Sequence, residues 1–215
     1  MASAAPHSRL LTAAARTVLR PMGLFQKGRS RTWLDDRGWW VGVVEFQPSS
    51  WARGSYLNVG CMWLWGAKDY ISFDEGYRVE RFLEFRNEMQ FEAQAKSLAE
   101  RAALEVARYR KLFPNVHEVC VHYLRQKPTG FWPNFHAAVA CALAGEGDEA
   151  RRHFKQVADW DAGNREWFIK EQAEARFLSA IVDDVARFRA VVAERVHLAR
   201  KLQKLPILKT LNFDQ

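Results

Sequence analysis

Hydrophobic and polar positions change their spacing near residue 90. Before that residue, apolar residues occur in short runs that are separated by glycine, proline and serine. Such runs are typical of β-strands joined by turns. After residue 90, apolar positions recur every three or four residues, which is the spacing of one face of an α-helix. The pattern therefore predicts an α+β protein, with an antiparallel sheet of four to five strands flanked by helices and followed by a C-terminal helical subdomain.

The strands of the first part are predicted from its apolar runs. They cover residues 24–34, 39–47, 56–65, 69–74 and 77–85. The connections between them are shorter than the dozen or so residues that a parallel crossover needs, so we expect an antiparallel sheet. The run at residues 56–65 is apolar on both faces, which predicts a central strand that is covered on both sides.

The segment before the first strand has no acidic residue and is rich in alanine and arginine. This composition resembles an organelle transit peptide. We expect instead an amphipathic helix that ends near Pro21, because its apolar residues recur at helical spacing. The residues predicted on its buried side are Leu10, Leu11, Ala14, Val18 and Leu19.

Helices are predicted throughout the second part. They cover residues 87–113, 116–126, 164–181 and 183–204, with an α-hairpin at residues 135–160. The hairpin turns at Gly145 and Gly147, and Asp148 is the expected N-cap of its second helix. It resembles a single tetratricopeptide-type unit, but no second copy follows at a fixed period, so no repeat array is expected. The predicted domains are residues 1–90, the first helix with the sheet, and residues 91–215, a helical subdomain packed on that sheet.

The cysteines and the hydropathy of the chain favour a reducing compartment and no membrane association. Cys61, Cys120 and Cys141 are isolated in apolar surroundings, and we expect three small buried side chains rather than a disulfide framework. That interpretation favours a reducing, cytoplasmic location. No apolar run approaches the length of about 20 residues that a membrane helix needs, so no membrane association is expected.

Basic residues are concentrated at the beginning of the chain. The formal net charge is +7. In residues 24–34, strand alternation would place basic side chains and one aromatic on a single face, a pattern used by proteins that bind single-stranded nucleic acid. The candidate nucleic-acid-binding residues are Lys27, Arg29, Arg31 and Trp33, with Arg37 and Arg53 in the following turn and loop. Alternatively, the charges protect an exposed sheet edge against aggregation.

Aromatic residues in predicted loops lead to the first functional hypothesis. The chain contains nine tryptophans and fourteen phenylalanines. Trp51 and Arg53 lie in a Ser/Trp loop, and Phe131 and Trp132 lie in the predicted loop before the α-hairpin. A loop aromatic either packs into the core or anchors a partner. These four residues are the candidate contacts of a non-enzymatic protein-interaction module that binds an as yet unidentified protein, in a bacterial accessory or immunity-type system.

Signatures of catalysis are weak in this sequence. His117 and His122 are five positions apart, which places them about 140° apart around a helix, so they cannot share a metal ion. No metal and no cofactor is expected, and no catalytic residue is assigned. A predicted strand row of Arg78, Glu80, Glu84 and Arg86 is the basis of a third hypothesis, a hydrolase-like enzyme, although we favour a solvated ladder of ion pairs as the explanation of the row.

Several short motifs in residues 8–90 also resemble a known family. They are Gly23-Leu24-Phe25-Gln26-Lys27, a strand ending in Phe46-Gln47, the Ser/Trp loop, Asn58-Val59-Gly60 and the charged strand of residues 77–82. Together they resemble the bacterial domain-of-unknown-function family DUF4304. The resemblance implies a cytoplasmic bacterial α+β protein and carries over no catalytic residue, because that family has no established activity.

Overall fold

The chain folds into two compact units. The structure is a computed structural model, and it describes residues 5–161, 163 and 165–214. Unit 1 comprises the described residues up to Met62 together with Ile71–Lys111, and unit 2 comprises Trp63–Tyr70 together with the described residues from Leu112 onward. The α+β class is confirmed. The boundary expected at residue 90 falls within a helix that groups with the sheet rather than with the later helices.

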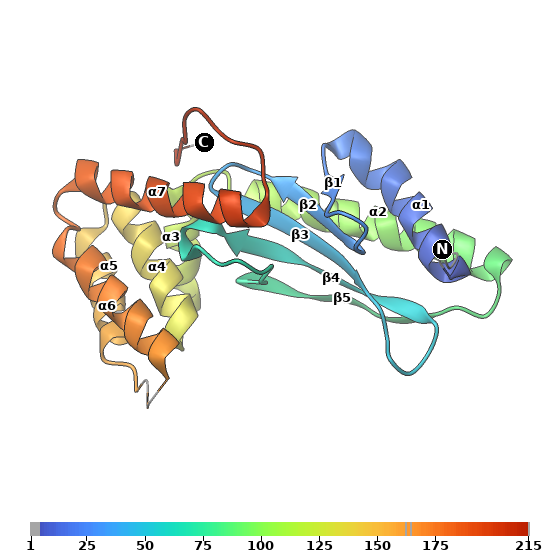
Figure 1. Cartoon of the computed structure of the whole chain (residues 1–215), viewed down its shortest axis with the longest axis horizontal. Helices are drawn as coiled ribbons and strands as arrows, with labels where there is room; N and C mark the ends of the chain where they lie inside the picture. The colour runs from blue at the N-terminus through green and yellow to red at the C-terminus, as the bar shows by residue number, and fades with distance from the viewer. Residues whose placement is uncertain (1–4, 162, 164, 215) are drawn as a thin grey trace. The chain divides into compact units, whose positions relative to one another are not determined.

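Unit 1 is built on an antiparallel sheet in which each strand lies beside the next strand of the chain (Figure 1). In the described residues the strands are β1 (Phe25–Gln26), β2 (Thr32–Asp36), β3 (Trp40–Gln47), β4 (Gly54–Trp63) and β5 (Glu75–Glu84). The short connections predicted this topology correctly. The last residue of β4, Trp63, is the first residue of unit 2.

Two predicted strands differ from the observed ones. The run at residues 24–34 is a hairpin rather than one strand, because the chain reverses at Gly28, which has a left-handed φ of 58°. Phe25 of β1 pairs with Leu34 of β2 in that hairpin. The run at residues 69–74 contains no strand and leads into β5 as a loop. An apolar run gives no sign of a reversal when the turn residue itself lies inside the run.

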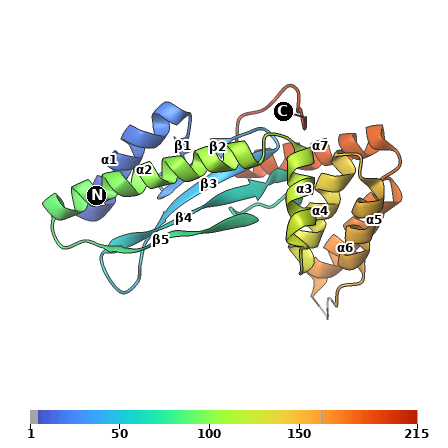
Figure 2. The same cartoon turned by 180° about the vertical axis from the view of Figure 1, so that it is seen from behind.

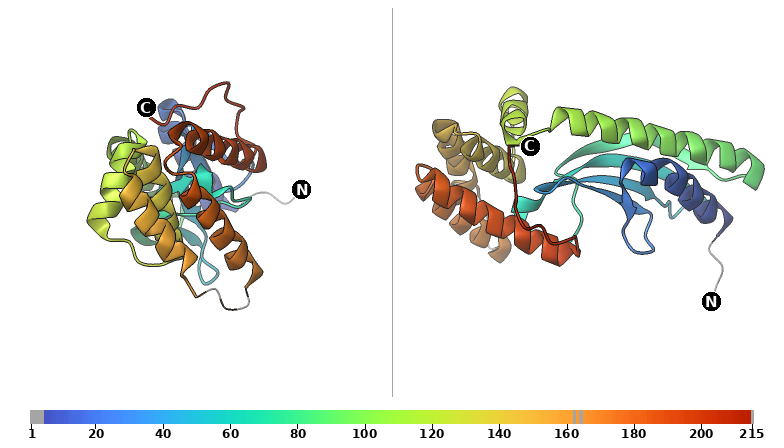
Figure 3. Two further views of the ribbon diagram at one scale, coloured as in Figure 1. Left: turned by 90° about the vertical axis from the view of Figure 1, so that its left-hand side faces the viewer. Right: turned by 90° about the horizontal axis from the view of Figure 1, so that it is seen from above.

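Helices α1 (Pro6–Leu19) and α2 (Glu88–Leu112) complete unit 1, with a short 3₁₀ turn, η1 (Arg20–Met22), after α1. Helix α2 runs along the sheet (Figures 2 and 3). The buried apolar stripe of α1 consists of Leu11, Ala15 and Leu19. The predicted stripe was therefore correct at Leu11 and Leu19, whereas Leu10, Ala14 and Val18 are only half-buried.

A bidentate ion pair fixes α2 on one face of the sheet. Asp35 of β2 is 3% exposed and accepts from Arg110 Nε at 2.8 Å and from Arg110 Nη2 at 2.7 Å. The same Nη2 donates to the carbonyl oxygen of Met22 at 2.7 Å. Asp35 pairs across the strands with Gly42, where a Cβ atom would lie 3.0 Å from the Asp35 Cβ. The absence of a side chain at position 42 therefore gives the carboxylate room to meet α2.

Unit 2 is a group of helices around one buried helix. Its elements are η2 (Leu64–Gly66), α3 (Val116–Gln126), α4 (Phe131–Leu143), α5 (Gly147–Ala158), α6 (Glu166–Ala180) and α7 (Val185–Gln203). Helix α4 is buried from Asn134 to Leu143 and packs against both α3 and α5. Trp63 and the segment that follows it are held to these helices by hydrogen bonds from Trp63 Nε1 to the Tyr123 hydroxyl at 2.8 Å and from Trp65 Nε1 to His136 Nδ1 at 3.1 Å.

The cysteine interpretation was wrong for two of the three residues. Cys120 of α3 and Cys141 of α4 form a disulfide, with their Cα atoms 4.8 Å apart, and Cys61 is a free buried cysteine. Two neighbouring helices bring the pair together, although 21 positions separate it in sequence. Sequence spacing alone does not show such a pairing. The argument from cysteine usage to a reducing compartment therefore loses its basis.

We expect Asp35→Asn to lower the free energy of unfolding by about 3 kcal/mol, because it leaves the Arg110 guanidinium without its carboxylate in a largely buried site. Asp36→Asn is the matched control, since the adjacent side chain accepts from the Gly38 amide and an asparagine can do the same. Urea denaturation of both variants measures the difference. Equal losses in the two variants would contradict the role of the ion pair.

The disulfide predicts a thiol count. The denatured, unreduced chain should react with one equivalent of iodoacetamide, at Cys61, and the reduced chain with three. Replacing Cys120 and Cys141 together by serine should lower the free energy of unfolding by about 3 kcal/mol, because the cross-link restricts the unfolded chain. Mass spectrometry counts the labels. Three labels without reductant would show that the bond is absent.

Candidate functional sites

The most exposed large side chain of the β3–β4 connection is Trp51, at 93% exposure. This connection projects beyond the ends of its strands (Figure 1). Within this connection the Trp51 amide donates to Ser49 Oγ at 3.1 Å. Arg53, two residues further on, is also exposed. The structure therefore presents one predicted pair of contact residues, Trp51 and Arg53, to solvent.

Arg31 supports the base of this loop. Its Nη1 donates to the Gly54 carbonyl oxygen at 3.3 Å, and its Nη2 contacts His7 Nε2 at 3.1 Å and donates to Ser8 Oγ. A guanidinium only donates hydrogen bonds, so His7 Nε2 accepts and the ring proton lies on Nδ1. Burial, reinforced by the charges of Arg31 and Arg53, lowers the pKa of His7. Arg31 thus links the loop to the beginning of α1.

The turn between β1 and β2 lies at the same end of the sheet. Thr32 at the start of β2 pairs with Glu45 near the end of β3, so the turn that carries Lys27 and Arg29 lies near the loop that carries Arg53. The basic residues at this end, together with the exposed Trp51, are called the basic tip, and its members are Lys27, Arg29, Arg31, Trp51 and Arg53. The electrostatic potential of the basic tip depends on its own cations together with the charged groups around them.

Two of the predicted nucleic-acid-binding residues do not belong to the basic tip. Trp33 is 1% exposed and lies on the face of β2 that meets α2, because it shares that face with Asp35. Arg37 lies in the β2–β3 turn at the opposite end of the strands. The single basic face predicted for residues 24–34 is wrong, because the hairpin at Gly28 ends the alternation on which it depended.

The second predicted pair lies in unit 2 and starts a helix rather than a loop. Phe131 and Trp132 form the first turn of α4. Phe131 is 5% exposed, with its ring centroid 4.8 Å from that of Phe168, so it is a core residue. Trp132 is half-buried, and the Lys68 ammonium lies 4.4 Å from its ring centroid. These residues and the basic tip belong to different units, and each is a separate candidate.

The charged row of β5 is divided by a bulge. Asn58 pairs with Arg78 whereas Leu57 pairs with Glu80, so the register shifts by one residue between them. Arg78 consequently donates to Gln47 Oε1 at 2.9 Å, while Glu80 forms an ion pair with Arg101 of α2. The shared face predicted for the row is wrong, because a one-residue slip moves a side chain to the other face.

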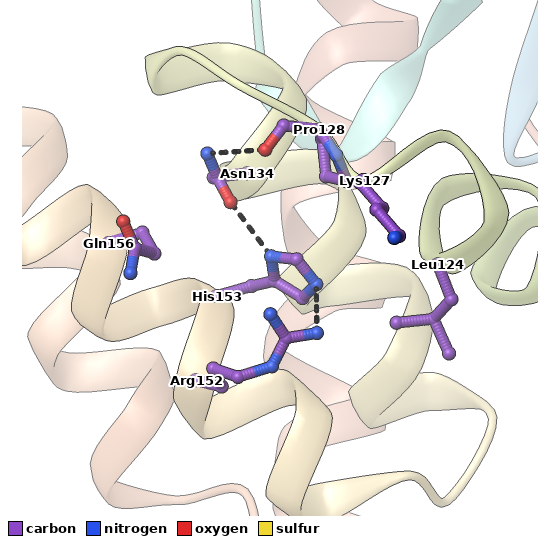
Figure 4. A pocket seen from close by; sticks show the side chains of 7 residues that line it. All are labelled: Leu124, Lys127, Pro128, Asn134, Arg152, His153 and Gln156. Atoms are coloured by element: carbon purple, nitrogen blue, oxygen red, sulfur yellow. Dashed lines mark hydrogen bonds between the residues drawn. The ribbon is translucent and has the colours of Figure 1, made fainter.

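Unit 2 contains a cavity that the sequence did not predict (Figure 4). It has a volume of about 410 Å³. Its lining residues come from the end of α3, the following loop, the start of α4 and one face of α5, and they are Leu124, Lys127, Pro128, Asn134, Arg152, His153 and Gln156. His153 is 2% exposed and lies between α4 and α5, and no sequence signal indicated that it faces a cavity.

Hydrogen bonds determine the tautomer of His153. Asn134 Nδ2 donates to the carbonyl oxygens of Gly130 at 2.8 Å and Pro128 at 3.3 Å, which turns Asn134 Oδ1 toward His153 Nδ1 at 2.8 Å. An amide oxygen only accepts, so Nδ1 carries the proton and Nε2 is left as the acceptor. Arg152 Nη2 lies 3.2 Å from that Nε2. Burial and the Arg152 charge both lower the pKa of His153, which keeps the ring neutral at pH 7.

The part of the chain that the structure describes contains no group of three or more His, Cys, Asp or Glu side chains placed to hold a metal ion. None of its helices is both long enough and apolar enough to cross a membrane.

Comparisons with known proteins found no relative. No family model, no curated protein and no solved structure matches this chain. The resemblance of residues 8–90 to a domain-of-unknown-function family therefore stays a prediction.

Two of the buried histidines, His7 and His153, predict a loss of stability in acid. The folded-state pKa values of His7 and His153 lie below the ordinary value of 6.5, so the unfolded chain binds more protons as the pH falls through that value. The contribution of each neutral imidazole to the free energy of unfolding is therefore fully present above pH 6.5 and decreases below it. Denaturation midpoints measured between pH 5 and 7 should fall with pH. The denaturation midpoint of the His153→Gln variant should fall less steeply with pH than that of the wild-type protein. An identical slope would contradict the assignment of a buried neutral imidazole to His153.

Proposed function

We propose that this protein is a protein-interaction module that docks a partner on the basic tip. The observation that supports the proposal most strongly is the 93% exposure of Trp51. An indole contributes a large apolar area when it is buried, and tryptophan and arginine are enriched among the residues that dominate binding energy. Trp51 and Arg53 therefore have the side-chain types and the exposure expected of an interface anchor.

The support beneath the loop favours binding without a large ordering cost. Arg31 ties the Gly54 carbonyl to the start of α1, and Gly54 itself approaches β5 so closely that a Cβ atom would lie 2.1 Å from the Leu83 carbonyl oxygen. A loop held in this way loses little conformational entropy on binding. The positive charges of Lys27, Arg29 and Arg53 favour a partner surface that is acidic.

Nucleic acid is the second candidate partner, because the basic tip combines basic side chains with the exposed ring of Trp51. Bases stack on exposed aromatic rings while nearby cations contact the phosphates. The proposed site would then be Lys27, Arg29, Arg31 and Arg53 with Trp51 in place of Trp33. Salt separates the two candidates, because a phosphate-dominated affinity falls steeply as the ionic strength rises.

The proposed setting is an accessory or immunity-type role in the bacterial cytoplasm. The Cys120–Cys141 bond stands against this setting, since disulfides seldom persist in reducing compartments. Labelling thiols in intact cells before lysis tests this part of the proposal separately. Three accessible thiols after denaturation would support a reducing compartment, and one would place the protein in an oxidising compartment.

We expect Trp51→Ala to abolish partner capture without unfolding the chain. Its removal should weaken binding by about 2 kcal/mol or more, the range of an interface hot spot, and should change stability by less than about 0.5 kcal/mol. The measurement is affinity capture from the native host at moderate salt after nuclease treatment, with the captured protein quantified by mass spectrometry.

Met89→Ala is the matched control for capture, because Met89 is 86% exposed and lies in the same unit. One stoichiometric protein that is lost with Trp51→Ala and retained with Met89→Ala would support the proposal. Equal capture by both variants would reject the basic tip. A captured species that disappears after nuclease treatment would transfer the site to nucleic acid.

A further inference from the structure

The cavity of unit 2 combines a buried polar floor with a positively charged rim (Figure 4). Asn134 and His153 are buried, whereas Lys127 and Arg152 are exposed at its edge. None of its lining residues is acidic. A concave site of this volume is at the small end of the range that binds small molecules, and its polar groups would determine which molecules it accepts.

Lys127 provides the first positive charge. No carboxylate of the described residues lies within ion-pair distance of its ammonium group. Its backbone is fixed in the left-handed region, with φ at 52°, and its amide donates to the Tyr123 carbonyl oxygen at 3.1 Å as the cap of α3. The side chain therefore starts from a defined point at the cavity edge.

Arg152 provides the second positive charge, and one of its N–H groups remains available to a ligand. Its Nε donates to Glu149 Oε2 at 2.9 Å, and its Nη2 meets both that carboxylate and His153. Within the described part of the chain, Nη1 has no hydrogen-bond partner. The Glu149 pair holds the guanidinium plane in place, and a ligand could accept from Nη1 without displacing it. Arginine recognises anions through this planar set of donors.

Leu124 and Pro128 form an apolar wall beside the polar floor and the charged rim. A ligand that matches both the rim and the apolar wall needs a compact anionic group for Lys127 and Arg152, and an uncharged part for Leu124 and Pro128. A terminal phosphate matches the two cations well, because its oxygens can accept from the Lys127 ammonium and from Arg152 Nη1. A phosphate monoester carries nearly two negative charges at pH 7 and a carboxylate only one, so the two cations favour the phosphate.

We propose that this cavity binds a small phosphate monoester, with Lys127 and Arg152 on the phosphate and Leu124 and Pro128 against the ester group. The site is separate from the basic tip, since every lining residue belongs to unit 2. The proposal therefore does not depend on the partner-binding function.

Isothermal titration of the full chain with phenyl phosphate tests the proposal, with inorganic phosphate and benzoate as comparison probes. We expect one site with a dissociation constant below about 1 mM for phenyl phosphate. Inorganic phosphate should bind more weakly because it leaves the apolar wall uncovered, and benzoate more weakly because it carries only one negative charge. Absence of saturable phenyl phosphate binding, or equal affinity for all three probes, would overturn the proposal.

Two substitutions locate the binding site within the chain. Lys127→Asn removes the charge but keeps a residue that tolerates the left-handed backbone, and it should weaken binding about tenfold or more, as expected for a lost charge-assisted hydrogen bond. Lys204→Asn is its matched control, because Lys204 caps α7 with φ at 58° and is exposed. The dissociation constant of this control for phenyl phosphate should stay within about twofold of the wild-type value.

Arg152→Gln and Arg151→Gln form a second matched pair on α5. Arg151 pairs with Asp148 and Asp183 and does not line the cavity, so its loss should leave binding unchanged. Arg152→Gln should weaken phenyl phosphate binding about tenfold. If Lys127→Asn and Arg152→Gln both bind as tightly as their controls, the ligand sits elsewhere and the assignment of this cavity is wrong.

Discussion

The buried ion pair between Asp35 and Arg110 is the constraint on which the architecture of unit 1 depends. It joins the second strand, the last turns of α2 and the turn after α1 through three hydrogen bonds. A carboxylate that is almost fully buried requires such a partner, because an unpaired charge would be costly. By fixing β2 against α2, the pair also fixes Arg31 just before that strand. The support beneath the Trp51 loop is therefore a consequence of how the sheet meets its helix.

An analogous constraint operates in unit 2. The Cys120–Cys141 bond joins α3 to α4, and the cavity is lined by the end of α3, the start of α4 and one face of α5. Asn134 contacts two backbone carbonyls of the intervening loop and the ring of His153. The Asn134 amide thus joins the loop to α4 and α5 and determines the tautomer of His153. Each unit carries its own candidate site, built from its own packing.

The elements with strong periodicity could be predicted from the sequence. The runs at residues 39–47, 87–113 and 116–126 correspond closely to β3, α2 and α3, because spacing and terminal prolines determine them locally. The basic face at residues 24–34 was wrong because Gly28 turns the chain inside an apolar run. The charged row of β5 was wrong because a bulge depends on the pairing strand, which a single segment does not reveal.

The candidate sites were predictable only in part. Trp51 and Arg53 were identified as loop residues, yet the sequence left burial and exposure equally open. Phe131 was assigned to a loop because proline and glycine surround it, but Gly130 precedes a helix that begins at Phe131. The cavity and the disulfide depend on contacts between α3, α4 and α5, which are distant in sequence. Such contacts follow from tertiary packing and not from local composition.

Photo-cross-linking from position 51 tests the central claim most directly. A p-benzoylphenylalanine replaces Trp51 in the full chain, the chain is expressed in its native host, and illuminated cells are analysed for covalent adducts. Docking on the basic tip predicts one dominant protein adduct from position 51 and none from the same label at the equally exposed position 89. No adduct from position 51, or the same adducts from both positions, would contradict the claim that this loop binds a partner.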